Sequence, residues 1–209
     1  MIKSKNERSA LSVKLPALFL VVFVLFPVMY ASGQTKFGDK TAPFFKIFSS
    51  GTYHMKAKST SGGTTSDTDF YCKGGISAII TTESGESMRI VLKDKKMYMI
   101  FETSKMMMIT PSMEDQIPTT IIETDKIKFT GSGTAVFAGK SLPYDEYAGA
   151  DGGKSQYFVD GNKLAGIRTV SKEGTEDAVV AALDQNIPNN VFDIPGSGYT
   201  VQDMSGMGR

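Results

Sequence analysis

Alternation of apolar and polar side chains with a period of two is the feature that most limits how this chain can fold. Tyr53, Met55 and Ala57 alternate with polar residues, as the buried and solvent-exposed faces of a strand require. Turn signals break the runs at short spacing, and Asp160-Gly161 suits the positive φ of a tight hairpin. Similar runs recur at residues 88–93, 127–130 and 157–159. The pattern predicts a meander of antiparallel strands.

Helix-forming segments are scarce. A short helix is predicted over residues 42–49, with Thr41 as its cap and Pro43 tolerated in its first turn. A second short helix is predicted over residues 112–117, where acidic residues suit a helix N-terminus. The segment 178–183 is ambiguous, because its valines favour strand while its alanines permit helix. We predict strand there, and therefore a mainly β fold of the α+β type.

A charge-free run of seventeen residues, 15–31, follows a basic leader. This arrangement is typical of a secretory signal peptide, and Ala31-Ser32-Gly33 offers the small residues that a cleavage site needs. We expect residues 1–33 to be removed, with cleavage after Ala31 as the alternative. An uncleaved anchor helix is a second alternative, and membrane contact is expected only in that case. The predicted location is extracytoplasmic: secreted, periplasmic or membrane-tethered at the outer face.

The remaining chain is nearly neutral and has the length of one domain. Residues 34–209 carry 19 basic and 21 acidic residues, a net charge of minus two. No basic stripe is present to neutralise phosphates, so nucleic-acid binding is disfavoured. We predict a single domain over residues 34–200 and a flexible tail over 201–209. The only cysteine, Cys72, has no internal partner, and its place in a strand-like run favours a buried thiol over an intermolecular bond.

Methionine is concentrated in one predicted hairpin, with Met97, Met99, Met106–108 and Met113 close together. One interpretation is ordinary core, since methionine fills irregular gaps. Another is an adaptable wall for a lipid or other apolar ligand. A third is a thioether copper site, but neighbours on a strand point to opposite faces and cannot share one ion. The residues predicted to line an apolar ligand cavity are Met55, Met88, Met97, Met99, Phe101, Met106 and Met108.

Catalytic constellations are missing from the sequence. The one histidine, His54, shares a predicted solvent face with Lys56 and Lys58, so a triad has no base. The glycine-lysine-serine stretch at 133–141 has five residues between its glycines where a phosphate loop needs four. The pair Asp145-Glu146, like Glu114-Asp115, is expected on the solvated surface. We predict no enzyme, no cofactor and no metal site.

The order of several segments resembles the lipoprotein carrier (LolA-like) superfamily, which includes lipoprotein localisation factors and a periplasmic sigma-factor regulator domain. The stretch NVFDIP at 190–195 followed by Tyr199 is similar to the closing element of such domains, and KDKKMYMI at 93–100 to one of their hairpins. The resemblance implies an incomplete antiparallel β-barrel, a half-barrel meander with one or two short helices over its concave face. It also implies an apolar cavity of the kind that holds acyl chains. The chain has no tryptophan and no arginine matching the carriers' ligand-release residue, so lipoprotein transfer is not implied.

The residues and the resemblance lead to the same functional hypothesis. We predict a noncatalytic exported domain that binds a lipid, an acylated peptide or another hydrophobic ligand in an apolar cavity. The alternative is an envelope or extracellular protein-interaction or sensing domain, whose apolar face is fully packed and whose edges or loops meet a protein partner.

Overall fold

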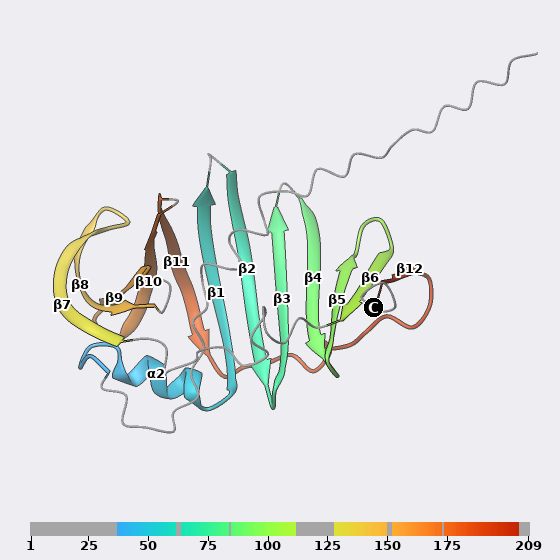
Figure 1. Cartoon of the computed structure of the whole chain (residues 1–209), viewed down its shortest axis with the longest axis horizontal. Coiled ribbons are helices and arrows are strands. Elements are labelled where there is room, and N and C mark those ends of the chain that lie inside the picture. The colour runs from blue at the N-terminus through green and yellow to red at the C-terminus, as the bar shows by residue number, and fades with distance from the viewer. Residues whose placement is uncertain are drawn as a thin grey trace, which may run out of the picture.

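The computed structural model describes residues 37–61, 64–83, 85–111, 128–149, 152–172 and 174–204. Within these ranges there are one helix and one sheet of twelve strands (Figure 1). The elements are α2 (Ala42–Ser49), β1 (Thr52–Ser61), β2 (Thr64–Lys73), β3 (Ile76–Glu83), β4 (Glu86–Lys93), β5 (Lys96–Phe101), β6 (Met106–Pro111), β7 (Lys128–Phe137), β8 (Lys140–Ala148), β9 (Lys154–Asp160), β10 (Lys163–Ser171), β11 (Gly174–Asp184) and β12 (Thr200–Asp203).

The sheet consists of two meanders joined at its middle. Strands β1 to β6 follow one another across one half, strands β11 to β7 across the other, and β1 pairs with β11. All pairs are antiparallel except β12, which lies parallel to β6. The sheet does not close, because β12 and β7 are its two edges. The predicted mainly β fold, an incomplete antiparallel barrel with a short helix, is confirmed.

Helix α2 packs its aromatic residues on one face of the sheet, which we call the helix face. Phe44, Phe45 and Phe48 are buried, as the 3.6-residue period of a one-sided helix requires. The helix has its predicted bounds, with proline in its first turn. Thr41 is the N-cap residue, but its side chain makes no capping hydrogen bond. The expected cap is therefore wrong, because that hydroxyl bonds to the sheet instead.

The opposite face of β3 to β6 is covered by the C-terminal strap, which we define as residues 185–204. Val191 is buried there against Ala78, Val91 and Ile100, and Met107 belongs to the same cluster. The strap ends in β12, so residues 201–203 form strand where the sequence suggested a loose tail. The parallel pairing with β6 explains the difference, because a four-residue strand is ordered by its hydrogen bonds to the sheet edge.

Local strand predictions hold where the structure describes them. The ambiguous segment 178–183 lies inside β11, and Gly161 has the positive φ of 62° that its hairpin turn needs. The leader, Met113, the predicted helix at 112–117 and the pair Glu114-Asp115 lie outside the described residues. Among the described residues, no helix has the length and apolar character needed to cross a bilayer.

Candidate functional site

The N-terminus of α2 is attached to β8 through a buried carboxylate. Asp145 is fully buried, and it accepts hydrogen bonds from the backbone N–H of Thr41 at 2.9 Å and from its hydroxyl at 3.0 Å. The hydroxyl of Ser132 donates to its second oxygen at 2.5 Å, and the Lys40 ammonium lies 3.7 Å from that oxygen. The expectation of a solvated Asp145 is therefore wrong, because this side chain is a structural acceptor beneath the helix.

Aromatic rings fill the space between α2 and the middle of the sheet. Phe45 lies 5.1 Å from Tyr147 and 5.2 Å from Tyr157, measured between ring centroids. Phe48 meets Tyr53 edge to face at 5.2 Å, a favoured geometry for aromatic pairs. The part of the helix face formed by β1, β8 and β9 is therefore packed by the helix.

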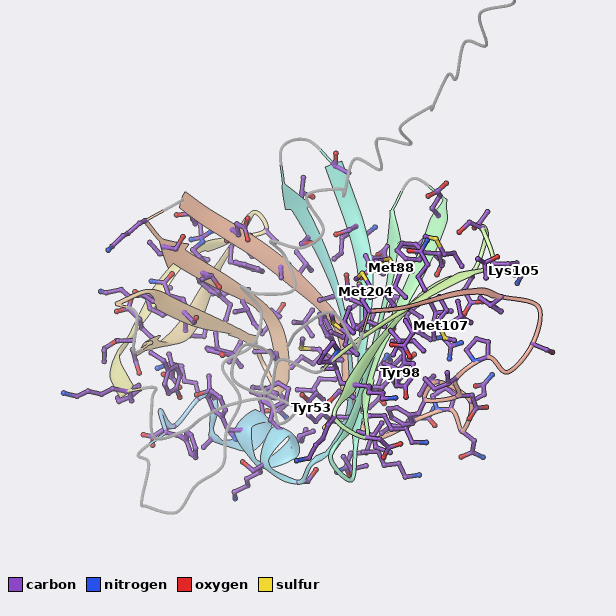
Figure 2. The ribbon with its side chains drawn as sticks, turned by 45° about the vertical axis from the view of Figure 1, so that its right-hand side comes forward. Tyr53, Met88, Tyr98, Lys105, Met107 and Met204 are labelled. Atoms are coloured by element: carbon purple, nitrogen blue, oxygen red, sulfur yellow. The ribbon has the colours of Figure 1, made fainter. Side chains whose placement is uncertain are left out.

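The helix is too short to reach the rest of this face. Eight residues make a helix about 12 Å long, whereas the six strands β1 to β6 span about 24 Å at a spacing of roughly 4.8 Å. Figure 2 shows Tyr53 beside α2, while Met88, Tyr98 and Met107 lie in the strands away from it. The strand that α2 mainly contacts is β1, so the helix face of β4 to β6 lies beyond its main contacts.

The apolar surface beyond the helix is built in rows across β4, β5 and β6, and we call it the methionine wall. Met97 and Met99 are 7% exposed and belong to the core cluster of the helix face, and three further members are half-buried. The register places Met88 beside Phe101 and Met106, Ile90 beside Met99 and Met108, and Leu92 beside Met97 and Thr110.

Six of the seven predicted cavity residues lie on β4 to β6, and Met55 lies on β1 in the continuation of the row of Ile90, Met99 and Met108. The structure brings Met88, Met97, Met99, Phe101 and Met108 into one cluster, and Met106 shares a row with Phe101. Met55 also belongs to the helix-face cluster, but it sits on β1 and is 1% exposed. Sequence periodicity identified the face, but the place of Met55 depends on the pairing of β1 with β2 and β11.

The three consecutive methionines divide between the two faces. Met108 belongs to the helix face, whereas Met107 is buried beneath the strap. Their thioethers therefore lie on opposite sides of β6, which argues against a shared copper ion. Over the described part of the chain, no group of three histidine, cysteine or acidic side chains is arranged to hold a metal ion.

Two buried hydroxyls on the helix face lack a hydrogen-bond partner among the described residues, and the sequence did not identify them. One belongs to Tyr53, which is 1% exposed, and the other to Thr110 beside Met97. Burial raises the pKa of Tyr53 well above its ordinary value, so its hydroxyl keeps its proton at neutral pH. A buried hydroxyl without a partner is unfavourable, and both could bond to a polar group of a ligand or to water.

A cleft of about 520 Å³ lies beside α2 and is lined by residues of β8, β10 and β11. This volume is within the range of ordinary small-molecule sites. Its walls are largely apolar, and the ion pair between Lys140 and Asp160 (3.1 Å) stands at its rim. The apolar lining residues are Phe44, Ile47, Leu142, Leu164, Val180 and Leu183.

The one histidine and the one cysteine of the sequence both lie in packed surroundings. His54 stacks on Tyr71 at 4.6 Å, and its Nε2 lies 2.8 Å from Asp69. Its side chain is only 14% exposed, so the expected exposed position is wrong. Cys72 is buried as predicted, and burial raises the pKa of its thiol, which disfavours the reactive thiolate.

Comparisons with known proteins find likeness in structure and none in sequence. No family model matches the chain, and no curated protein does. An uncharacterised conserved protein from Thermus thermophilus has 8% identity and a TM-score of 0.51, over 79% of this chain and 99% of that one. LprF from Mycobacterium bovis has 12% identity and a TM-score of 0.40, over 72% and 97% of the two chains.

A LolA superfamily protein from Nitrosomonas europaea has 9% identity and a TM-score of 0.38, over 72% of this chain and 97% of that one. The structures found thus include a member of the superfamily that the sequence resembles, at a TM-score too low to carry an argument about this chain. At these identities the likeness concerns the fold, and the site has to be argued from the residues of this chain.

Proposed function

We propose that this protein is a noncatalytic, extracytoplasmic binding domain for a lipid, an acylated peptide or another hydrophobic ligand. The observation that carries the proposal is the methionine wall, an apolar surface beyond the reach of α2. A half-barrel with one short helix leaves such a surface to be covered by something else, because an apolar sheet face in water is unfavourable.

The chemistry of the wall suits ligands of variable shape. Methionine side chains are unbranched and polarizable, so they adapt to an acyl chain without a fixed complementary form. The hydroxyls of Tyr53 and Thr110 are the polar groups on this face that lack a partner among the described residues. A few polar groups in an apolar site fix the orientation of a ligand, and we assign that role to the hydroxyl of Thr110, which lies beside Met97, whereas Tyr53 is packed against α2.

A fluorescent fatty acid tests the proposal on residues 34–209. We expect saturable binding by the native protein, and loss of binding by Met99→Asp in a protein that stays folded. An aspartate in an accessible wall remains hydrated, whereas one in a sealed core loses its hydration without a partner. Met99→Leu, which keeps apolar volume, is the control expected to fold and to bind. Met107→Asp introduces the same charge beneath the strap and is expected to unfold the domain.

The second candidate is a protein-interaction or sensing domain with a packed core. The low exposure of Met97 and Met99 favours it, because both values are typical of ordinary core residues. This candidate predicts that Met99→Asp unfolds the protein as Met107→Asp does, and that no acyl probe binds. Native mass spectrometry of freshly purified protein adds a second readout: a retained acyl ligand supports the first candidate, and the bare polypeptide mass supports the second.

A further inference from the structure

Two neighbouring hairpin turns concentrate lysines at one end of the sheet. Lys73 ends β2, and residues 93–96 form the turn between β4 and β5. Both turns lie at the end of the sheet where α2 is found (Figure 1). The register places Lys93 opposite Lys96, and Lys73 is separated from Lys93 by β3 alone. We call Lys73, Lys93, Lys95 and Lys96 the basic edge.

The β4–β5 hairpin breaks two local rules of stable turns. Like charges opposite each other across a hairpin are unfavourable, yet Lys93 faces Lys96. The turn residues Asp94 and Lys95 have φ of 53° and 59°, a conformation for which glycine, asparagine and aspartate are preferred. Lys95 is therefore the turn residue that departs from the preference. Departures of this kind are expected where a surface has a function.

The basic edge differs in charge from the rest of the chain. The basic edge carries four lysines and one aspartate, although residues 34–209 have a net charge of minus two. Lys93 and Lys96 are one strand spacing apart, about 5 Å, and Lys73 is about 10 Å from Lys93, near the Debye length of roughly 8 Å at physiological salt. Neighbouring lysines of the edge therefore act together on an anionic surface.

The basic edge adjoins the methionine wall. The row of Leu92 and Met97 is one residue from the row of Lys93 and Lys96. Strand neighbours alternate in direction, so Lys93 and Lys96 belong to the face opposite to Leu92 and Met97. The two rows adjoin only at the ends of β4 and β5, and a surface that met these strands end-on would contact the lysines and lie next to the end of the apolar wall.

We propose that the basic edge docks this domain on the surface of an anionic phospholipid bilayer and so presents the end of the methionine wall to membrane lipid. This role rests on the proposed function, since docking on a membrane would bring the binding site to its apolar ligand. Lysine suits this partner, because clustered ammonium groups are attracted to anionic headgroups as point charges, about 1 kcal/mol for each residue. A site for one defined phosphate would instead be expected to use the bidentate fork of arginine.

Vesicle sedimentation tests the docking. We expect residues 34–209 to bind vesicles that contain phosphatidylglycerol, to bind pure phosphatidylcholine vesicles weakly, and to dissociate when salt is raised several-fold above about 0.15 M. The variant Lys73→Gln/Lys93→Thr/Lys96→Thr keeps the turn residues 94 and 95, and we expect it to bind roughly 100-fold more weakly. The control is Lys128→Gln/Lys163→Gln/Lys172→Gln, which removes the same charge from exposed positions elsewhere and should bind as the native chain does.

Three results would overturn the docking. They are an equal loss of vesicle binding in both triple variants, equal binding of the native protein to both kinds of vesicle, and binding of the native protein to dextran sulfate in solution as tight as its binding to the bilayer. The fatty acid assay without vesicles separates this proposal from the function on which it rests. A native chain that takes up fatty acid but ignores anionic vesicles refutes the docking alone. A chain that binds vesicles through the basic edge but takes up no fatty acid refutes the ligand-binding function alone.

Discussion

Asp145 and Thr41, 104 residues apart in sequence, are joined by two hydrogen bonds of 2.9 and 3.0 Å that fix the start of α2 on β8. The carboxylate is fully buried, so its desolvation is offset only while its donors stay in place. The position of the one described helix on the sheet therefore depends on a polar contact as well as on its phenylalanines.

Replacing this carboxylate is expected to destabilise the fold strongly. Asp145→Ala removes the carboxylate that accepts from the N–H and hydroxyl of Thr41 and from the hydroxyl of Ser132, and we expect a loss of about 3 kcal/mol in the free energy of unfolding. Urea denaturation measures it. Asp160→Ala removes the exposed partner of Lys140 and should cost under about 1 kcal/mol. Similar losses in the two variants would show that the buried network does not position α2.

Arg89 is expected to hold the C-terminal strap. Its Nη1 donates to the backbone oxygens of Asn190, Val191 and Asp193, while Nε and Nη2 donate to Glu102. Arg89→Lys keeps the charge but loses the planar fork, and we expect faster hydrogen exchange at the β12 amides. The control Arg168→Lys changes the pair with Asp177 on β10 and β11, and its strap should exchange as in the native chain. Unchanged exchange in Arg89→Lys would contradict the assignment.

The strap contact is also expected to depend on pH through Glu102. The hydrogen bond from Tyr199, followed by that from Arg89, lowers the pKa of Glu102 below its ordinary value, although burial opposes the shift. A depressed carboxyl pKa stabilises the fold above the unfolded value of about 4.3 and loses that effect as pH falls through the folded value. Glu102→Gln should therefore be less stable than the native chain at pH 7, and the difference should shrink below about pH 4. A difference independent of pH would be contrary to this expectation.

Local signals were enough to predict the helix at 42–49, several strands and the alternation of faces, but not β12. The helix at 42–49 follows from its proline and phenylalanines, and the hairpins follow from turn residues with period-two runs. The burial of Asp145 could not be predicted, because its partner Thr41 is distant in sequence; the neighbouring Glu146, also expected to be solvated, is only 17% exposed and pairs with Lys154. The separation of Met55 from the methionine wall likewise depends on the β1–β11 pairing, which no local pattern specifies.

The packing of the strap is a second feature that the sequence could not predict. The sequence identified the stretch around Phe192 and Tyr199 as a closing element, but its packing against Ile100 and Met107 depends on contacts far along the chain. Because alternation gives two faces without saying what covers each, the sequence left open whether the hairpin of Met97–Met108 was covered twice or lined a cavity.

The hydroxyl of Tyr53 is expected to lower stability in the free protein. Tyr53→Phe removes a buried hydroxyl with no partner among the described residues, and we expect the free energy of unfolding to rise by about 1 kcal/mol. Tyr147→Phe is the matched comparison: that hydroxyl accepts the N–H of Gly38 at 3.0 Å and lies 2.5 Å from the hydroxyl of Thr41. Its loss should cost about 1 kcal/mol or more. Equal losses in the two variants would show that Tyr53 has a partner in solution.

Met107 and Met108 are adjacent in sequence but are expected to serve different purposes. Met107 is 5% exposed beneath the strap, so Met107→Ala should cost about 2 kcal/mol or more through the cavity that it leaves. Met108 is half-buried in the methionine wall, so Met108→Ala should cost less stability and weaken fatty acid binding more. Urea denaturation and probe titration on both variants measure the two effects. If both variants lose stability and fatty acid binding in the same proportion, the two faces of β6 are packed alike. The protein-interaction candidate then replaces the ligand-binding one.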